Sequence, residues 1–143
     1  MNLLLLAFQT VITGANLAQP IPPTDYSCRL EAVDGARFTL SGRTPPFPVG
    51  FDANASLPAQ IGGEGMPELI GEARISPGHA SDYFREFQLS TYRPGGRHYR
   101  VSLMLRRDGT SVAYATIFVE NDRRIPYDYL AAGLCTSNFD SAG

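Results

Sequence analysis

A cluster of basic residues in the second half of the chain is the strongest chemical signal in this sequence. Arg93 and Arg97 flank the turn segment 94–96, and His98 and Arg100 follow on the next expected strand. Guanidinium groups bind phosphate, sulfate and carboxylate through several N–H donors, and the amides of a turn can add further donors. We therefore predict an anion-binding site that comprises Arg93, Arg97, His98 and Arg100. The alternative is that these arginines only keep an exposed hairpin tip soluble.

Residues for catalysis or metal binding are not arranged in any known pattern. The two histidines, His79 and His98, are not spaced as a pair of metal ligands, and neither cysteine has a second ligand nearby. The sequence contains no Gly-x-Ser-x-Gly segment that would carry a nucleophilic serine. We therefore assign no catalytic residue, no metal and no cofactor, and we expect a binding protein rather than an enzyme.

Cys28 and Cys135 are the only two cysteines. An even count predicts one disulfide if the chain is exported to an oxidising compartment. That bond would close a loop of roughly 107 residues, which is worth about 4–5 kcal/mol in terms of chain entropy. Two buried thiols are the alternative for a chain that stays in the cytosol.

The N-terminal region has the order of segments found in a secretory signal peptide. The first 24 residues carry no charged side chain, and an apolar run starting at Leu3 is followed by small residues up to Ala18. We predict a leader over residues 1–18, with cleavage after Ala15 or Ala18, and a single domain over 19–143. The expected location is the periplasm or the exterior of a bacterial cell.

Composition excludes several classes of partner. The chain has 143 residues, 43% of them hydrophobic and 18% charged, which is typical of an ordered globular domain. A formal net charge of −2 gives no general attraction to nucleic acid or anionic lipid. No apolar run reaches the roughly 18 residues of a membrane-spanning helix. All 12 basic residues are arginine, which we attribute to genomic bias.

Strands are expected to position all of these residues. At least five segments alternate apolar and polar residues, and none shows a sustained helical period. We predict an all-β fold, a small antiparallel sandwich or closed barrel of about 7–8 strands. The disulfide would join its N-terminal strand to the C-terminal segment. The sandwich is slightly favoured, because the Pro- and Gly-rich segment 44–66 suits a crossing between two sheets.

Three hairpins can be aligned by requiring one wholly apolar face. A three-residue loop at 33–35 pairs Leu30 with Phe38, and a three-residue loop at 94–96 pairs Leu89 with Val101. For the third hairpin, the same test favours a two-residue Asp108-Gly109 turn of type I′ that pairs Leu105 with Val112. Three further segments are expected to be irregular: the lead-in 19–26, the Gly-rich segment 59–68 and the turn region 76–82.

The sequence supports three hypotheses for function. We favour a non-catalytic binding module of the cell envelope, whose arginine-rich hairpin tip engages an anionic envelope component or an acidic protein surface. The second hypothesis is a structural or stress-protective periplasmic protein. The third is a hydrolase or a protein similar to the periplasmic barrels that inhibit lysozymes, although no inhibitor motif is present and two terminal cysteines are too common to assign a family.

Overall fold

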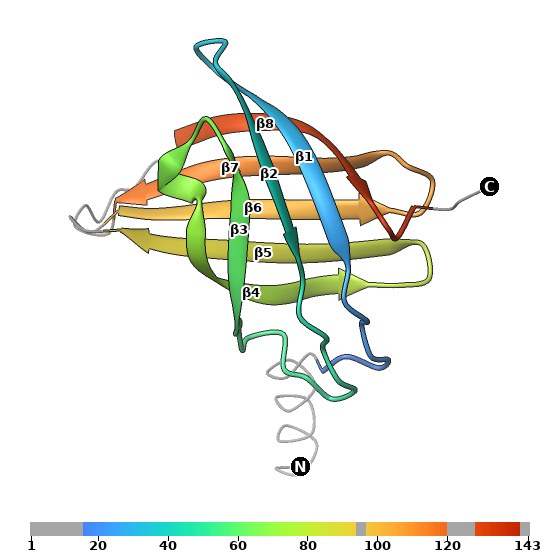
Figure 1. The fold of residues 1–143 in the computed structure, drawn as a ribbon. Coiled ribbons are helices and arrows are strands. Elements are labelled where there is room, and N and C mark those ends of the chain that lie inside the picture. The colour runs from blue at the N-terminus through green and yellow to red at the C-terminus, as the bar shows by residue number, and fades with distance from the viewer. Residues whose placement is uncertain (1–15, 94–96, 120–127, 141–143) are drawn as a thin grey trace, which may run out of the picture.

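The computed structural model describes residues 16–93, 97–119 and 128–140. Eight strands each run antiparallel to the next, and the last pairs with the first, so the sheet closes into a barrel (Figure 1). Closure selects the barrel over the sandwich of the two predicted architectures. A short 3-10 helix, η1 (Pro67–Leu69), precedes the fourth strand. The strands are β1 (Asp25–Ala32), β2 (Arg37–Arg43), β3 (Leu57–Glu64), β4 (Gly71–Ala80), β5 (Phe84–Arg93), β6 (Arg97–Arg106), β7 (Ser111–Val119) and β8 (Asp128–Ser137).

The barrel interior is filled by large side chains on one side and small ones on the other. Strands β5 and β6 supply large inward residues such as Leu103, whereas β7 supplies Ala113 and Ala115. Val101 faces Ala115, and Leu103 faces Ala113, so each large residue meets a small one. An eight-stranded barrel has an interior just wide enough for such packing. Within the described part of the chain, no helix is long and apolar enough to cross a membrane.

Two of the three predicted hairpin registers are confirmed. Leu30 faces Phe38 across β1 and β2, as the three-residue loop requires. Leu89 faces Val101 across β5 and β6, although the turn at 94–96 itself lies outside the described residues. In both hairpins the apolar residues used for the alignment lie on the face that points into the barrel.

The predicted register of the third hairpin is wrong by one residue. Val112 faces Met104 rather than Leu105, and the chain turns through a three-residue loop that ends at Gly109. Gly109 has a φ of 83°, and its N–H donates to the carbonyl of Arg106 at 3.1 Å. A type I′ turn would need a positive φ at Asp108 as well, and no described residue other than glycine has one. The shift turns Val112 outward.

Two segments that were predicted to be irregular are strands. The Gly-rich segment 59–68 contributes most of β3, and β4 continues through the predicted turn region to Ala80, with a register shift after Pro77. Both strands are paired on each side, so the closed sheet supplies partners that their local sequence does not reveal. Gly63 faces Leu40, and a Cβ atom at position 63 would lie 1.9 Å from the carbonyl oxygen of Thr39, so β3 can approach β2 this closely only with glycine there.

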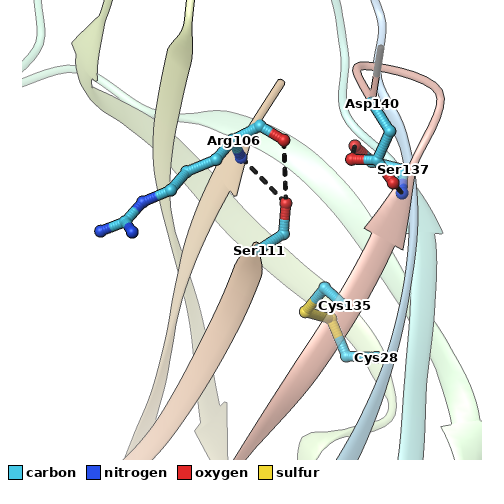
Figure 2. The surroundings of a disulfide bond; sticks show 6 residues. All are labelled: Cys28, Arg106, Ser111, Cys135, Ser137 and Asp140. Carbon is cyan, nitrogen blue, oxygen red and sulfur yellow. Dashed lines mark hydrogen bonds between the residues drawn. A yellow bond between two sulfur atoms is a disulfide. The ribbon is translucent and has the colours of Figure 1, made fainter. Parts of the chain in front are cut away.

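The barrel closes between β8 and β1, and the predicted disulfide lies at this seam. Cys28 and Cys135 face each other directly and are covalently bonded (Figure 2). The next pair of residues on the inner face is Leu30 and Gly133, which lie opposite each other. A Cβ atom at position 133 would lie 1.7 Å from the carbonyl oxygen of Arg29, so only glycine allows β8 to approach β1 this closely.

One end of the barrel is covered by residues 16–24, which we call the N-terminal strap. The strap pairs with the loop between β2 and β3, and Ile21 exchanges backbone hydrogen bonds of 2.8 and 2.9 Å with Phe47. Phe47 is fully buried and stacks on Phe87 inside the barrel, with 5.9 Å between ring centroids. At the other end, the buried Leu69 of η1 covers the interior.

We expect the substitution Tyr26→Phe to stabilise the protein. Tyr26 is only 4% exposed, and its hydroxyl has no hydrogen-bond partner among the described residues. Removing a buried unsatisfied hydroxyl should raise the free energy of unfolding by about 1 kcal/mol, as measured by urea denaturation. Equal or lower stability of the variant would show that the hydroxyl is satisfied.

The same substitution should change the response to alkaline pH. Burial raises the pKa of Tyr26 above its ordinary value of 10.0. Above that pH the unfolded chain releases the proton while the folded chain keeps it, so the stability of the wild type falls as pH rises. Tyr26→Phe should lack this contribution, which amounts to about 1.4 kcal/mol per pH unit. Parallel denaturation curves of both proteins between neutral and strongly alkaline pH would reveal the difference.

The double substitution Cys28→Ser/Cys135→Ser should destabilise the barrel strongly. The bond spans 107 residues, and its loss should lower the free energy of unfolding by about 4–5 kcal/mol. Urea denaturation of the variant, and of the wild type with and without reductant, measures this loss. A midpoint that does not move on reduction would contradict the assigned role of the bond.

Candidate anion-binding cleft

The predicted arginine site lies at one end of the β5–β6 hairpin. Arg93 and Arg97 are direct partners across the two strands, while the turn between them and both of their side chains lie outside the description. His98 is buried, and its ring stacks on that of Tyr92 with 4.3 Å between centroids. Arg100 is half-buried on the same strand. Anion binding at this tip stays a prediction.

At the opposite end of the same hairpin, a cleft of about 360 Å³ opens beside the N-terminal strap. One wall is the strap itself, and another is the turn between β4 and β5. Its floor carries two arginines and a phenylalanine that were not predicted to act together. The lining residues are Leu17, Ala18, Gln19, Pro20, Ile21, Ala80, Ser81, Asp82, Arg85, Arg107 and Phe139.

Arg85 sits at the mouth of the barrel on the inward face of β5. It faces Leu105 and shares its side of the strand with Phe87, which is fully buried. Its Nη1 donates to the Oγ1 of Thr24 at 2.7 Å. Thr24 is itself fully buried and is held by the backbone N–H of Thr44, which donates to the Thr24 carbonyl at 2.9 Å. The strap therefore orients this guanidinium.

Arg107 comes from the turn between β6 and β7 and meets Arg85 over one aromatic ring. Its Nε donates to the carbonyl of Asp82 at 2.8 Å. The Cζ atoms of Arg85 and Arg107 lie 4.1 and 4.4 Å from the ring centroid of Phe139. Attraction between a cation and the electrons of a ring partly offsets the cost of bringing two like charges together.

Phe139 is held in place by the turn that follows β8. Its N–H donates to the Oγ of Ser137 at 3.2 Å, and that hydroxyl donates to the carboxylate of Asp140 at 3.3 Å. The N–H of Asn138 donates to the carbonyl of Asp25 at the start of β1. Figure 2 shows Ser137 and Asp140 at the end of β8, beyond the disulfide. The disulfide seam thus fixes the strand from which Phe139 projects.

The electrostatics of the cleft favour an anion. Burial, followed by repulsion from Arg107, lowers the pKa of Arg85 below its ordinary value. Asp82 also lines the cleft, but no carboxylate of the described residues forms an ion pair with Arg85 or Arg107. A bound phosphate, sulfate or carboxylate would relieve the repulsion and accept guanidinium N–H groups.

A larger hollow of about 950 Å³ on the outer face of β8, β1 and β2 lacks this charge imbalance. Arg29 and Arg37 line it together with Glu31 and Glu64. Glu31 lies directly opposite Arg37, so this hollow carries as many acidic as basic side chains. Within the described residues, no group of three or more His, Cys, Asp or Glu side chains is placed to hold a metal ion.

The sequence contains a signal for one residue of the cleft. Arg85 stands two positions before Phe87 and four before Leu89, so the strand period places it on the inward face, where an arginine is unusual. Arg107 belongs to the basic stretch already noted, but its partners come from elsewhere in the chain. Phe139 lies in a polar tail that shows no local pattern.

Comparison of the chain with models of known protein families, with curated proteins and with solved structures found no match. The geometry of the cleft is therefore the basis for assigning a function.

Proposed function

We propose that this chain is an exported, non-catalytic binding module of the cell envelope that holds an anionic group in the cleft of Arg85 and Arg107. The observation that carries this proposal is the convergence of two unneutralised guanidinium groups over the Phe139 ring. The anionic group is a phosphate, a sulfate or a carboxylate, either free or at the end of a larger ligand.

Hydrogen bonding supports this assignment. Each guanidinium has five N–H donors, and within the described part of the chain Arg85 and Arg107 each donate one side-chain hydrogen bond. The remaining donors are available to an oxyanion. Partial burial of Arg85 lowers the local dielectric constant and strengthens such charge-assisted bonds.

Export is supported by two independent features. The disulfide between Cys28 and Cys135 is of a kind that persists in oxidising compartments and is rare in the cytosol. The uncharged N-terminal region has the composition of a secretory leader. A periplasmic or secreted location belongs to this proposal.

Titration with inorganic phosphate and sulfate at low ionic strength tests the site. Arg107→Ser and Arg85→Gln should each weaken phosphate binding about tenfold or more, because each removes charge-assisted hydrogen bonds. Arg74→Ser is the matched control, since Arg74 is an exposed arginine whose guanidinium donates to Ser56 elsewhere on the barrel. Isothermal titration calorimetry measures all four proteins.

The triple substitution Arg93→Ser/Arg97→Ser/Arg100→Ser separates the cleft from the hairpin tip. It should leave phosphate binding unchanged, because the tip is at the other end of the β5–β6 hairpin. If this variant loses binding while Arg107→Ser keeps it, the tip is the site. If phosphate, sulfate and acetate all fail to bind the wild-type protein at millimolar concentration, the proposal is refuted.

A further inference from the structure

Apolar side chains gather on the outer face of the barrel, where strands β6, β7 and β8 lie side by side (Figure 1). Successive residues of a strand point to opposite faces of the sheet. Because Leu103 and Ala113 are buried in the interior, their neighbours on the strands point outward. We call the outward apolar residues of these three strands the outer patch: Met104, Val112, Tyr114, Ala132 and Leu134.

The outer patch is open to solvent. Leu134 is 71% exposed and Tyr114 is 40% exposed, while the other three residues are half-buried. Ala132 and Leu134 also line the hollow of about 950 Å³ on this side of the barrel. Contiguous exposed apolar residues with a polar border are typical of a surface that contacts a partner.

The register of the strands arranges this surface in two rows that cross β6, β7, β8 and β1 in that order. The first row consists of Met104, Val112, Leu134 and Arg29. The second row consists of Ser102, Tyr114, Ala132 and Glu31. Both rows end on β1 at an exposed charged residue, and these two charges have opposite signs.

A second copy of the same chain is complementary to this arrangement. When two identical faces meet, a two-fold axis relates them, and each residue pair across the interface occurs twice. An axis that lies in the interface and runs across the strands between the rows places the first row of one copy opposite the second row of the other. Arg29 then meets Glu31 of the second copy, and Leu134 meets the small Ala132. Charge and side-chain size are both matched.

We propose that the outer patch is the interface of a two-fold dimer of this chain. All eight described strands are paired on both sides, so two barrels meet through their faces rather than by adding a strand. A two-fold contact uses the outer patch of both copies and therefore stops at two. None of the five patch residues lines the cleft of Arg85 and Arg107, so this inference is independent of the proposed anion binding.

Sedimentation equilibrium of the disulfide-bonded protein, from micromolar to millimolar concentration, tests the dimer. We expect the wild type to show a monomer–dimer equilibrium without larger species. Leu134→Glu should weaken dimerisation about tenfold or more, because it brings a charge into the apolar centre of the interface. Val49→Glu is the matched control and should leave dimerisation unchanged, since Val49 is 61% exposed in the loop between β2 and β3, outside the patch.

A charge exchange tests how the two copies are oriented. Arg29→Glu and Glu31→Arg should each weaken dimerisation severalfold, because each places like charges opposite each other across the interface. The double substitution Arg29→Glu/Glu31→Arg should restore most of the wild-type affinity, since opposite charges then meet again. Loss of a merely structural role would not be reversed in this way. Melting temperatures show that each variant is folded.

Three results would overturn the inference. A wild type that stays monomeric at millimolar concentration would leave the outer patch to a different partner. A dimer that tolerates Leu134→Glu would have its interface elsewhere on the barrel. A folded double variant that dimerises no better than the two single variants would exclude the two-fold pairing of Arg29 with Glu31.

Discussion

The seam between β8 and β1 is the constraint on which the rest of the structure depends. A meander of eight strands closes only if the last strand returns beside the first, and that pairing joins the two ends of the described sheet. The Cys28–Cys135 bond lowers the entropy cost of bringing these strands together, because it restricts the unfolded chain. Gly133 then lets the two backbones approach more closely than any side chain would permit. Interior packing and both barrel ends depend on this closure.

The β8–β1 seam also determines where the residues of the cleft lie. Two residues beyond Cys135, the chain enters the turn that places Phe139, and the strap packs against the same end. The ring of Phe139 gives two like-charged guanidiniums a common surface, while Thr24 and the carbonyl of Asp82 orient them. The cleft is thus assembled from several separate stretches of sequence. The positive charge of the cleft therefore depends on the closed β8–β1 seam, because this seam places Phe139 where both guanidinium groups contact it.

The all-β class, the disulfide and two hairpin registers could be predicted because each rests on a local pattern or on pairing of two unique residues. The third register failed because the prediction placed every apolar residue inside. Val112 and Tyr114 in fact face outward, and alanines fill the interior opposite large residues. Strand β3 was missed because its glycines are typical of a loop. Only the closed sheet gives that segment partners on both sides.

The cleft was harder to predict than the fold. Arg85 could have been found from its inward position on β5, but Phe139 joins it only through closure, which no local pattern encodes. The hairpin tip drew attention because its arginines are neighbours in sequence. In the cleft, Arg85 and Arg107 come from opposite sides of the β5–β6 hairpin, where the N–H of Arg107 donates to the carbonyl of Tyr83 at 3.0 Å.

Closure of the barrel also limits self-association of the protein. Each of the eight described strands has a hydrogen-bonded neighbour on both sides, so the intact barrel offers no open edge to which another polypeptide could add a strand. Fibril growth through stacked backbones would first need the β8–β1 seam to separate. The covalent link at that seam therefore acts as a safeguard against aggregation, and a reducing environment would remove it.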